Sequence, residues 1–187
     1  MSRTCMPWPV GIVLSIVLLA LPAGAGATTA ASALSVAELT EASDLVVHGR
    51  IGTMHSYTEG DRIFTAVEVQ VENALKGDTA GGPLTLKLLG GEADGLRTMV
   101  IGAPCISSGE EVVFFLKANG AATYDVVNLA EGAFEVVRSD DGSATLRRDL
   151  RGIQYLEEST PPDLPETLEA LSDAVRAAAG ETPADMH

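Results

Sequence analysis

The chain has 187 residues, the size of a single domain, and its 12 basic and 26 acidic residues give a formal net charge of -14. Apolar residues make up 46% and charged residues only 20%, which is a globular composition and excludes a disordered acidic tail. The negative charge argues against nucleic-acid binding and against docking on anionic lipid, because both need clustered Lys and Arg.

The N-terminal segment has the pattern of a secretory signal peptide, with an apolar run over Val10–Leu21 followed by small residues over Ala23–Ala27. The run is shorter than the roughly 20 residues that span a bilayer. We therefore expect cleavage after Ala27, or alternatively after Ala25, and no stable membrane anchor afterwards. The exported protein is then expected in the periplasm or outside the cell. Its one remaining cysteine, Cys105, cannot close an internal disulfide.

Two helices are predicted, one near each end of the mature chain. Ser35 and Glu38 have the spacing of a capping box, which predicts a short helix directly after Ser35. Asp163 and Glu166 have the same spacing and predict a second, amphipathic helix that Gly180 ends.

Between the helices the sequence predicts a mainly β domain. Alternating or continuous apolar residues predict strands over residues 44–56, 63–75, 84–88, 96–101, 112–116, 124–129, 134–138 and 144–148. An acidic turn joins the first two in a hairpin, and the strand over 112–116 is expected to be buried because both of its faces are apolar. Helical crossovers, which parallel α/β folds need, are missing, so a single Greek-key barrel or sandwich is the expected architecture.

This pattern divides the chain into four parts. They are a signal peptide over residues 1–27, a flexible lead-in over 28–34, the β-barrel domain over 35–160, and the C-terminal helix and tail over 161–187.

Residue sets with metal-ligand spacing are not found, so neither a metal nor another cofactor is expected. His48 and His55 are seven residues apart on one predicted strand and point to opposite faces, and His187 is the last residue. We expect surface histidines. The acidic turn over residues 140–143 lacks the ligand ladder of a calcium loop and is predicted to be a hairpin turn.

Residue sets typical of a catalytic site are not found either, so an enzyme is not expected. Cys105 has no histidine in its own segment to act as a base, so we expect a small buried core residue. Residues 107–109 lack the G-x-S-x-G frame of a nucleophile elbow. Neighbouring acids such as Glu110 and Glu111 are expected on solvated faces, too scattered for glycosidase chemistry.

Three short motifs, in this order, resemble the netrin-like domains of tissue inhibitors of metalloproteinases and related secreted proteins. They are Ala42–Val47, Asn73–Gly77 and Gly109–Leu116, and the resemblance covers about Ala42–Leu129. It implies a five-stranded OB-fold barrel with the C-terminal helix against it. The chain is also similar to exported bacterial proteins with the same strand order.

The resemblance does not extend to protease inhibition. The metalloproteinase inhibitors begin with a disulfide-bonded cysteine whose amino group reaches the protease zinc, whereas the mature chain here is expected to begin at Thr28 and cannot form a disulfide. No residue of the inhibitory wedge is carried over.

The sequence therefore predicts an exported, non-enzymatic binding domain whose partner is a protein, for example an extracytoplasmic protease that it regulates. The alternatives are a hydrolase or accessory enzyme with a site assembled from distant residues, and a structural component of the envelope. By strand order, the netrin-like contact loop corresponds to residues 90–95. The candidate partner-binding residues in it are Gly90, Gly91, Glu92 and Asp94. The negative charges of Glu92 and Asp94 predict a basic partner surface.

Overall fold

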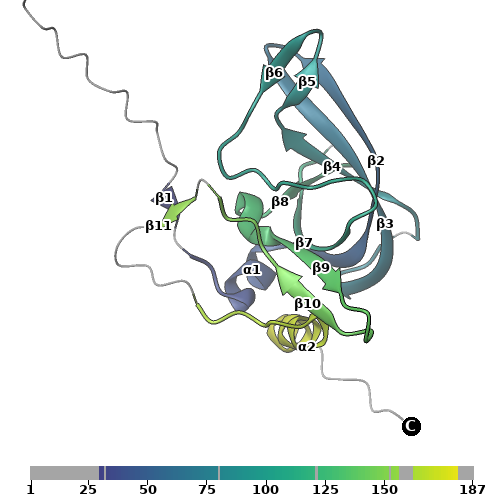
Figure 1. Cartoon of the computed structure of the whole chain (residues 1–187), viewed down its shortest axis with the longest axis vertical. Helices are drawn as coiled ribbons and strands as arrows, with labels where there is room; N and C mark the ends of the chain where they lie inside the picture. The colour runs from purple at the N-terminus through teal and green to yellow at the C-terminus, as the bar shows by residue number, and fades with distance from the viewer. Residues whose placement is uncertain are drawn as a thin grey trace, which may run out of the picture.

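The computed structural model describes residues 30–31, 33–79, 81–120, 122–151, 153–155 and 162–180. Over these residues the protein is mainly β, with a mixed sheet and two α-helices (Figure 1). The predicted leader, its cleavage site and His187 lie outside the described residues.

The predicted strands and helices appear in the predicted order, with three further short strands and a 3-10 turn among them. They are β1 (Ala30–Ala31), α1 (Val36–Ala42), β2 (Leu45–Glu59), β3 (Arg62–Lys76), β4 (Leu84–Leu89), β5 (Gly91–Ala93), β6 (Leu96–Thr98), β7 (Glu111–Ala118), β8 (Tyr124–Val126), a 3-10 turn (Leu129–Gly132), β9 (Ala133–Arg138), β10 (Ala144–Arg147), β11 (Gln154–Tyr155) and α2 (Leu168–Ala179). The long β2–β3 hairpin and the buried strand β7 are confirmed.

Seven strands form one sheet in the order β10-β9-β7-β2-β3-β4-β8. Every neighbouring pair is antiparallel except β4–β8, which is parallel and rests on the single residue pair Leu86↔Tyr124. β8 also pairs antiparallel with β7, so the pairings lead from β7 through β2, β3, β4 and β8 back to β7. The β4–β8 step is therefore the weakest connection in the sheet.

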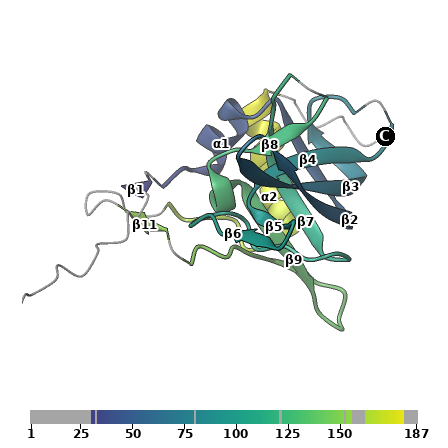
Figure 2. The same ribbon diagram turned by 90° about the horizontal axis from the view of Figure 1, so that it is seen from above.

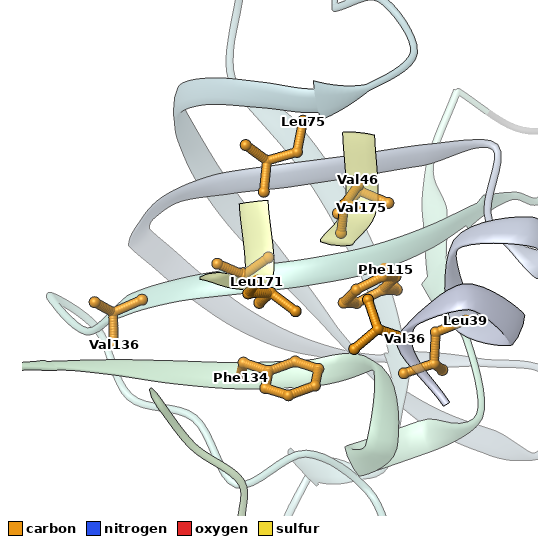
Figure 3. Close-up of a cluster of buried hydrophobic side chains, with 10 residues drawn as sticks. Val36, Leu39, Val46, Leu75, Phe115, Phe134, Val136, Leu171 and Val175 are labelled. Carbon is orange, nitrogen blue, oxygen red and sulfur yellow. The ribbon is translucent and has the colours of Figure 1, made fainter. Parts of the chain in front are cut away.

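The two faces of the sheet carry two separate apolar clusters, because successive side chains of a strand point to opposite sides. On one face the buried side chains all come from strands: Leu45, Val47, Ile51, Val67, Val69, Leu86, Val112, Phe114, Leu116 and Ala133. On the other face both helices cover the sheet. Figure 3 shows Leu171 and Val175 of α2 packed toward Val46, Phe115 and Phe134, with α1 beside them.

The first helix forms as predicted and the second begins later than predicted. Ser35 caps α1 in a full capping box with Glu38. α2 is capped by Thr167 and not by Asp163, because the preceding segment stays extended along β10, where Leu146 N–H donates to the Glu166 carbonyl at 2.8 Å. Gly180 ends α2 in the left-handed conformation that the sequence predicts.

The segment predicted as a loop over residues 90–95 is instead most of a second, small hairpin. β5 and β6 pair antiparallel through Glu92↔Arg97 and its neighbours, and the turn is Asp94–Gly95, both with positive φ. The predicted strand over residues 96–101 ends at Thr98. In Figure 1 this hairpin lies at the end of the molecule opposite α1 and α2, whereas the β1–β11 pair lies apart from the main sheet there and in Figure 2.

Candidate functional site

Charged side chains from four strands meet on the face of the sheet that the helices cover. We call this group the ionic cluster; it consists of His48, Arg50, Glu72, Glu111 and Arg138. Glu111 lies at its centre with a side chain only 5% exposed. Arg138 donates to both of its oxygens at 2.8 and 2.6 Å, and His48 Nε2 lies 2.7 Å from Oε1.

The cluster keeps Glu111 ionised. Hydrogen bonds from Arg138 lower the pKa of Glu111 from 4.5 to about 2, against the opposing effect of burial, and the contact with His48 adds to the lowering. Arg50 Nη2 is a further donor, 3.3 Å from Oε2. Two guanidinium groups thus surround one buried carboxylate, and Glu72 supplies the second negative charge.

His48, Glu72 and Glu111 offer ligand atoms within 4.8 Å of one another, a separation that suits a divalent cation. The surroundings do not, because both oxygens of Glu111 already accept two close contacts each. A cation would also displace or face the positive charges of Arg50 and Arg138. The residues present therefore fit an ion-pair network that links strands β2, β3, β7 and β9, and they do not fit a metal site.

The ionic cluster corrects two sequence expectations. His48 was expected at the surface and is buried at 8% exposure, and Glu111 was expected on a solvated face and is buried at 6%. The physical reason is register: His48 lies two residues after Val46, and Glu111 two residues before Val113, on the same faces as those core residues. Long-range pairing with Arg138 of β9 is what makes this burial possible.

Cys105 also differs from expectation, because it is exposed rather than buried. It lies in the connection between β6 and β7, where the next residue, Ile106, packs against the core and turns Cys105 outward. A polar cavity of about 420 Å³ beside Cys105 is lined by three arginines and three acids, and no described histidine lines it. A base that would activate this thiol is therefore missing from the described surroundings.

The predicted partner-binding residues Gly90, Gly91, Glu92 and Asp94 lie at the base and tip of the β5–β6 hairpin. The glycines allow close packing within the chain: a Cβ on Gly91 would lie 2.4 Å from the hydroxyl oxygens of Ser56 and Thr65. Asp94 accepts a hydrogen bond from Thr58 at 2.7 Å. Glu92 is exposed and faces Arg97 across the hairpin, so the negative charge of the loop is partly balanced. Whether these residues contact a partner stays a prediction.

Large exposed apolar side chains gather at this same end of the molecule. Of the seven in the described part of the chain, six lie on the β5–β6 hairpin, the connection after it, or the strands and 3-10 turn beside it. We call these six the apolar end surface: Met54, Leu89, Leu96, Met99, Ile101 and Leu129. Met99 is 80% exposed and Leu96 67%. The seventh, Val137, lies on β9.

Two hollows lie between four of these six residues, Met54, Leu89, Met99 and Leu129. One of about 190 Å³ lies between Phe64, Leu89 and Leu129, and a wider one of about 500 Å³ reaches Met54, Met99 and Gly91. Both are lined by the same five apolar residues: Leu88, Leu89, Val100, Ala103 and Pro104. The apolar end surface is therefore hollowed along β4.

This surface was not predicted, because the sequence pattern over residues 96–101 indicates a strand. The usable signal was three large apolar side chains, Leu96, Met99 and Ile101, in a segment with a glycine at each side. In the structure this segment lies between Gly95 and Gly102, both with positive φ, and Leu96, Met99 and Ile101 stay exposed.

Comparisons with protein-family models, curated proteins and solved structures found no match. Among the described residues, no helix is long and apolar enough to cross a membrane. Function therefore has to be argued from the site alone.

Proposed function

We propose that the chain is an exported, non-enzymatic domain that binds another protein through the apolar end surface. The observation that carries this proposal is that six of the seven exposed large apolar side chains in the described part of the chain gather at one end of a strongly acidic protein. Contiguous exposed apolar surface is unfavourable in water and marks interaction sites. Met99 and Met54 suit such a surface, because methionine adapts its shape to a partner.

The proposal includes an OB-type barrel as the scaffold. Its support is the set of pairings that runs from β7 through β2, β3, β4 and β8 back to β7. Five strands and one weak seam are consistent with the partly open Greek-key barrel of OB folds, in which one sheet face and its loops bind ligands. The β5–β6 hairpin then forms part of the long loop after the third barrel strand.

An enzyme is the less favoured alternative for physical reasons. Within the described residues, the strongest cluster of titratable groups is the ionic cluster, and its carboxylate and histidine are occupied by one another and by arginines. The exposed thiol of Cys105 has no histidine beside it in the described surroundings. A structural role in the envelope is distinguished by cell fractionation, because the proposal expects a protein that washes free of membrane and wall.

The test is a capture experiment with matched variants. Purified protein is immobilised as wild type, Met99→Glu and Val137→Glu, and each is exposed to the extracytoplasmic proteins of its source. We expect one partner on wild type and Val137→Glu that is lost on Met99→Glu, because only Met99 belongs to the apolar end surface. A partner retained equally by all three refutes the assignment of this surface.

The export part of the proposal rests on the leader pattern and has its own test. The intact mass of the secreted protein is expected to begin at Thr28, or after Ala25 by the alternative site. A full-length species retained in the membrane contradicts it.

A further inference from the structure

We propose that the hollow along β4 binds an extended, uncharged apolar peptide segment of the partner as an added strand. This inference rests on the proposed function and names the chemistry of the partner at the same surface. It is carried by the free edge of β4, which runs along the hollow.

β4 has a full partner on one edge only. Six residue pairs join it to β3, whereas the other edge meets β8 only at Leu86↔Tyr124. In a parallel pair the hydrogen bonds of Tyr124 go to the two residues that flank Leu86, so they extend no further than Lys87. In the described chain, Leu89 has no strand partner on this edge.

The direction of the free backbone groups follows from one hydrogen bond. Gly90 N–H donates to the Ile63 carbonyl at 2.8 Å, which fixes Gly90 as pointing toward β3. Because successive residues of a strand point their backbone groups to alternate edges, Leu89 points its N–H and C=O away from β3. This is the edge on which β4 meets β8 at Leu86, and Val126 of β8 lines the smaller hollow together with Leu89.

A free strand edge selects its occupant. An acyl chain that filled the hollow would remove water from the N–H and C=O of Leu89 and return no hydrogen bond, which is unfavourable. An extended peptide restores those bonds and places alternate side chains in the two hollows, as in strand addition to other sheet edges. The occupant is therefore a polypeptide.

The charges around the hollow select an uncharged segment. Lys87 is engaged by both oxygens of Glu59 at 2.7 and 2.9 Å, and its ammonium lies over the Phe64 ring. Arg97 lies across the hairpin from Glu92. Asp125, which also lines the smaller hollow, interacts electrostatically with Lys87. With these charges opposed locally and the lining otherwise largely apolar, a charged side chain in the added strand would be desolvated without compensation.

The test removes the backbone N–H of Leu89 by substitution with proline. Purified protein is used to select from a random decapeptide phage library, and the enriched peptides are labelled with fluorescein for titration against wild type, Leu89→Pro and Leu89→Val. Proline deletes the free N–H but no bond to β3, and a strand edge tolerates it. Valine keeps the N–H and serves as the matched control. Circular dichroism verifies that both variants are folded.

We expect enriched peptides with alternating apolar residues and few charges. Leu89→Pro should weaken their binding about tenfold, the effect of one lost backbone hydrogen bond, and Leu89→Val less than about twofold. Two versions of each peptide are N-methylated, one at the odd and one at the even residues. The version whose methylated N–H groups would face β4 should lose binding to the wild-type protein. This arm does not depend on the folding of a variant.

Three results overturn the inference: no enriched peptide, binding that is indifferent to both Leu89→Pro and N-methylation, or saturable binding of dodecanoate that Leu89→Pro leaves unchanged. The last identifies an acyl chain as the occupant. Failure here is distinguishable from failure of the proposed function. If partner capture is lost on Met99→Glu but unaffected by Leu89→Pro, the apolar end surface binds its partner without an added strand.

Discussion

Replacing Glu111 with glutamine removes the negative centre of the ionic cluster while keeping the side-chain size. The pKa of Glu111 lies at about 2 instead of 4.5, chiefly through the hydrogen bonds from Arg138. At about 1.36 kcal/mol per pH unit, this shift corresponds to about 3 kcal/mol of stability at neutral pH. Arg50 and Arg138 are 47% and 51% exposed, so water screens them and we expect a loss of about 2 kcal/mol for Glu111→Gln.

The assay is urea unfolding of wild type and Glu111→Gln across pH. Because the folded-state pKa is lowered, the stabilisation is complete well above pH 4.5 and is lost as pH falls toward 2. The difference between the two proteins should therefore be about 2 kcal/mol at pH 7 and close to zero near pH 2. Glu92→Gln, at an exposed position, is the control and should change stability by less than about 0.5 kcal/mol. A difference for Glu111→Gln that does not vary with pH refutes the reasoning.

Three further predictions follow from burial and backbone geometry. Cys105 is exposed, so a thiol reagent should label the native protein about as fast as the unfolded one, and strong protection in the native state contradicts this. Val69→Asp puts a charge at a position with 0% exposure and should cost about 3–5 kcal/mol or prevent folding, whereas Glu68→Ala should be nearly neutral in the same unfolding assay. Gly91→Ala should lower the melting temperature more than Gly60→Ala. Both glycines have positive φ, but only Gly91 has neighbours within 4 Å of the added Cβ. Equal shifts in melting temperature would contradict the close packing of Gly91 within the chain.

Most helices and strands could be predicted from local sequence pattern, because the residues that determine each of them are close together in the chain. The capping box at Ser35, the β2–β3 hairpin and the apolar strand β7 all follow from periodicity and turn chemistry. The start of α2 did not, because Glu166 and Thr167 are held extended by β10, a contact made by a segment about twenty residues earlier. Local spacing cannot report such a partner.

The site was predictable only in part for the same reason. Gly90 and Gly91, which the sequence offers as partner-binding candidates, line the wider hollow, whereas the apolar side chains around them were not predicted. The burial of Glu111 depends on Arg138, which lies in another strand. The exposure of Met99 depends on how the other segments of the chain pack around it. Both are properties of tertiary packing, which no local motif encodes.

Hydrogen–deuterium exchange of the protein with and without its captured partner tests the central claim most directly, because it maps the interface without any substitution. Binding at the apolar end surface predicts slower exchange of backbone amides in β4, in the β5–β6 hairpin and in the connection over residues 99–106, with the Leu89 amide among the most strongly protected. The helices and the β9–β10 hairpin should exchange unchanged. Protection confined to those elements, with none along β4 or the β5–β6 hairpin, would contradict the account.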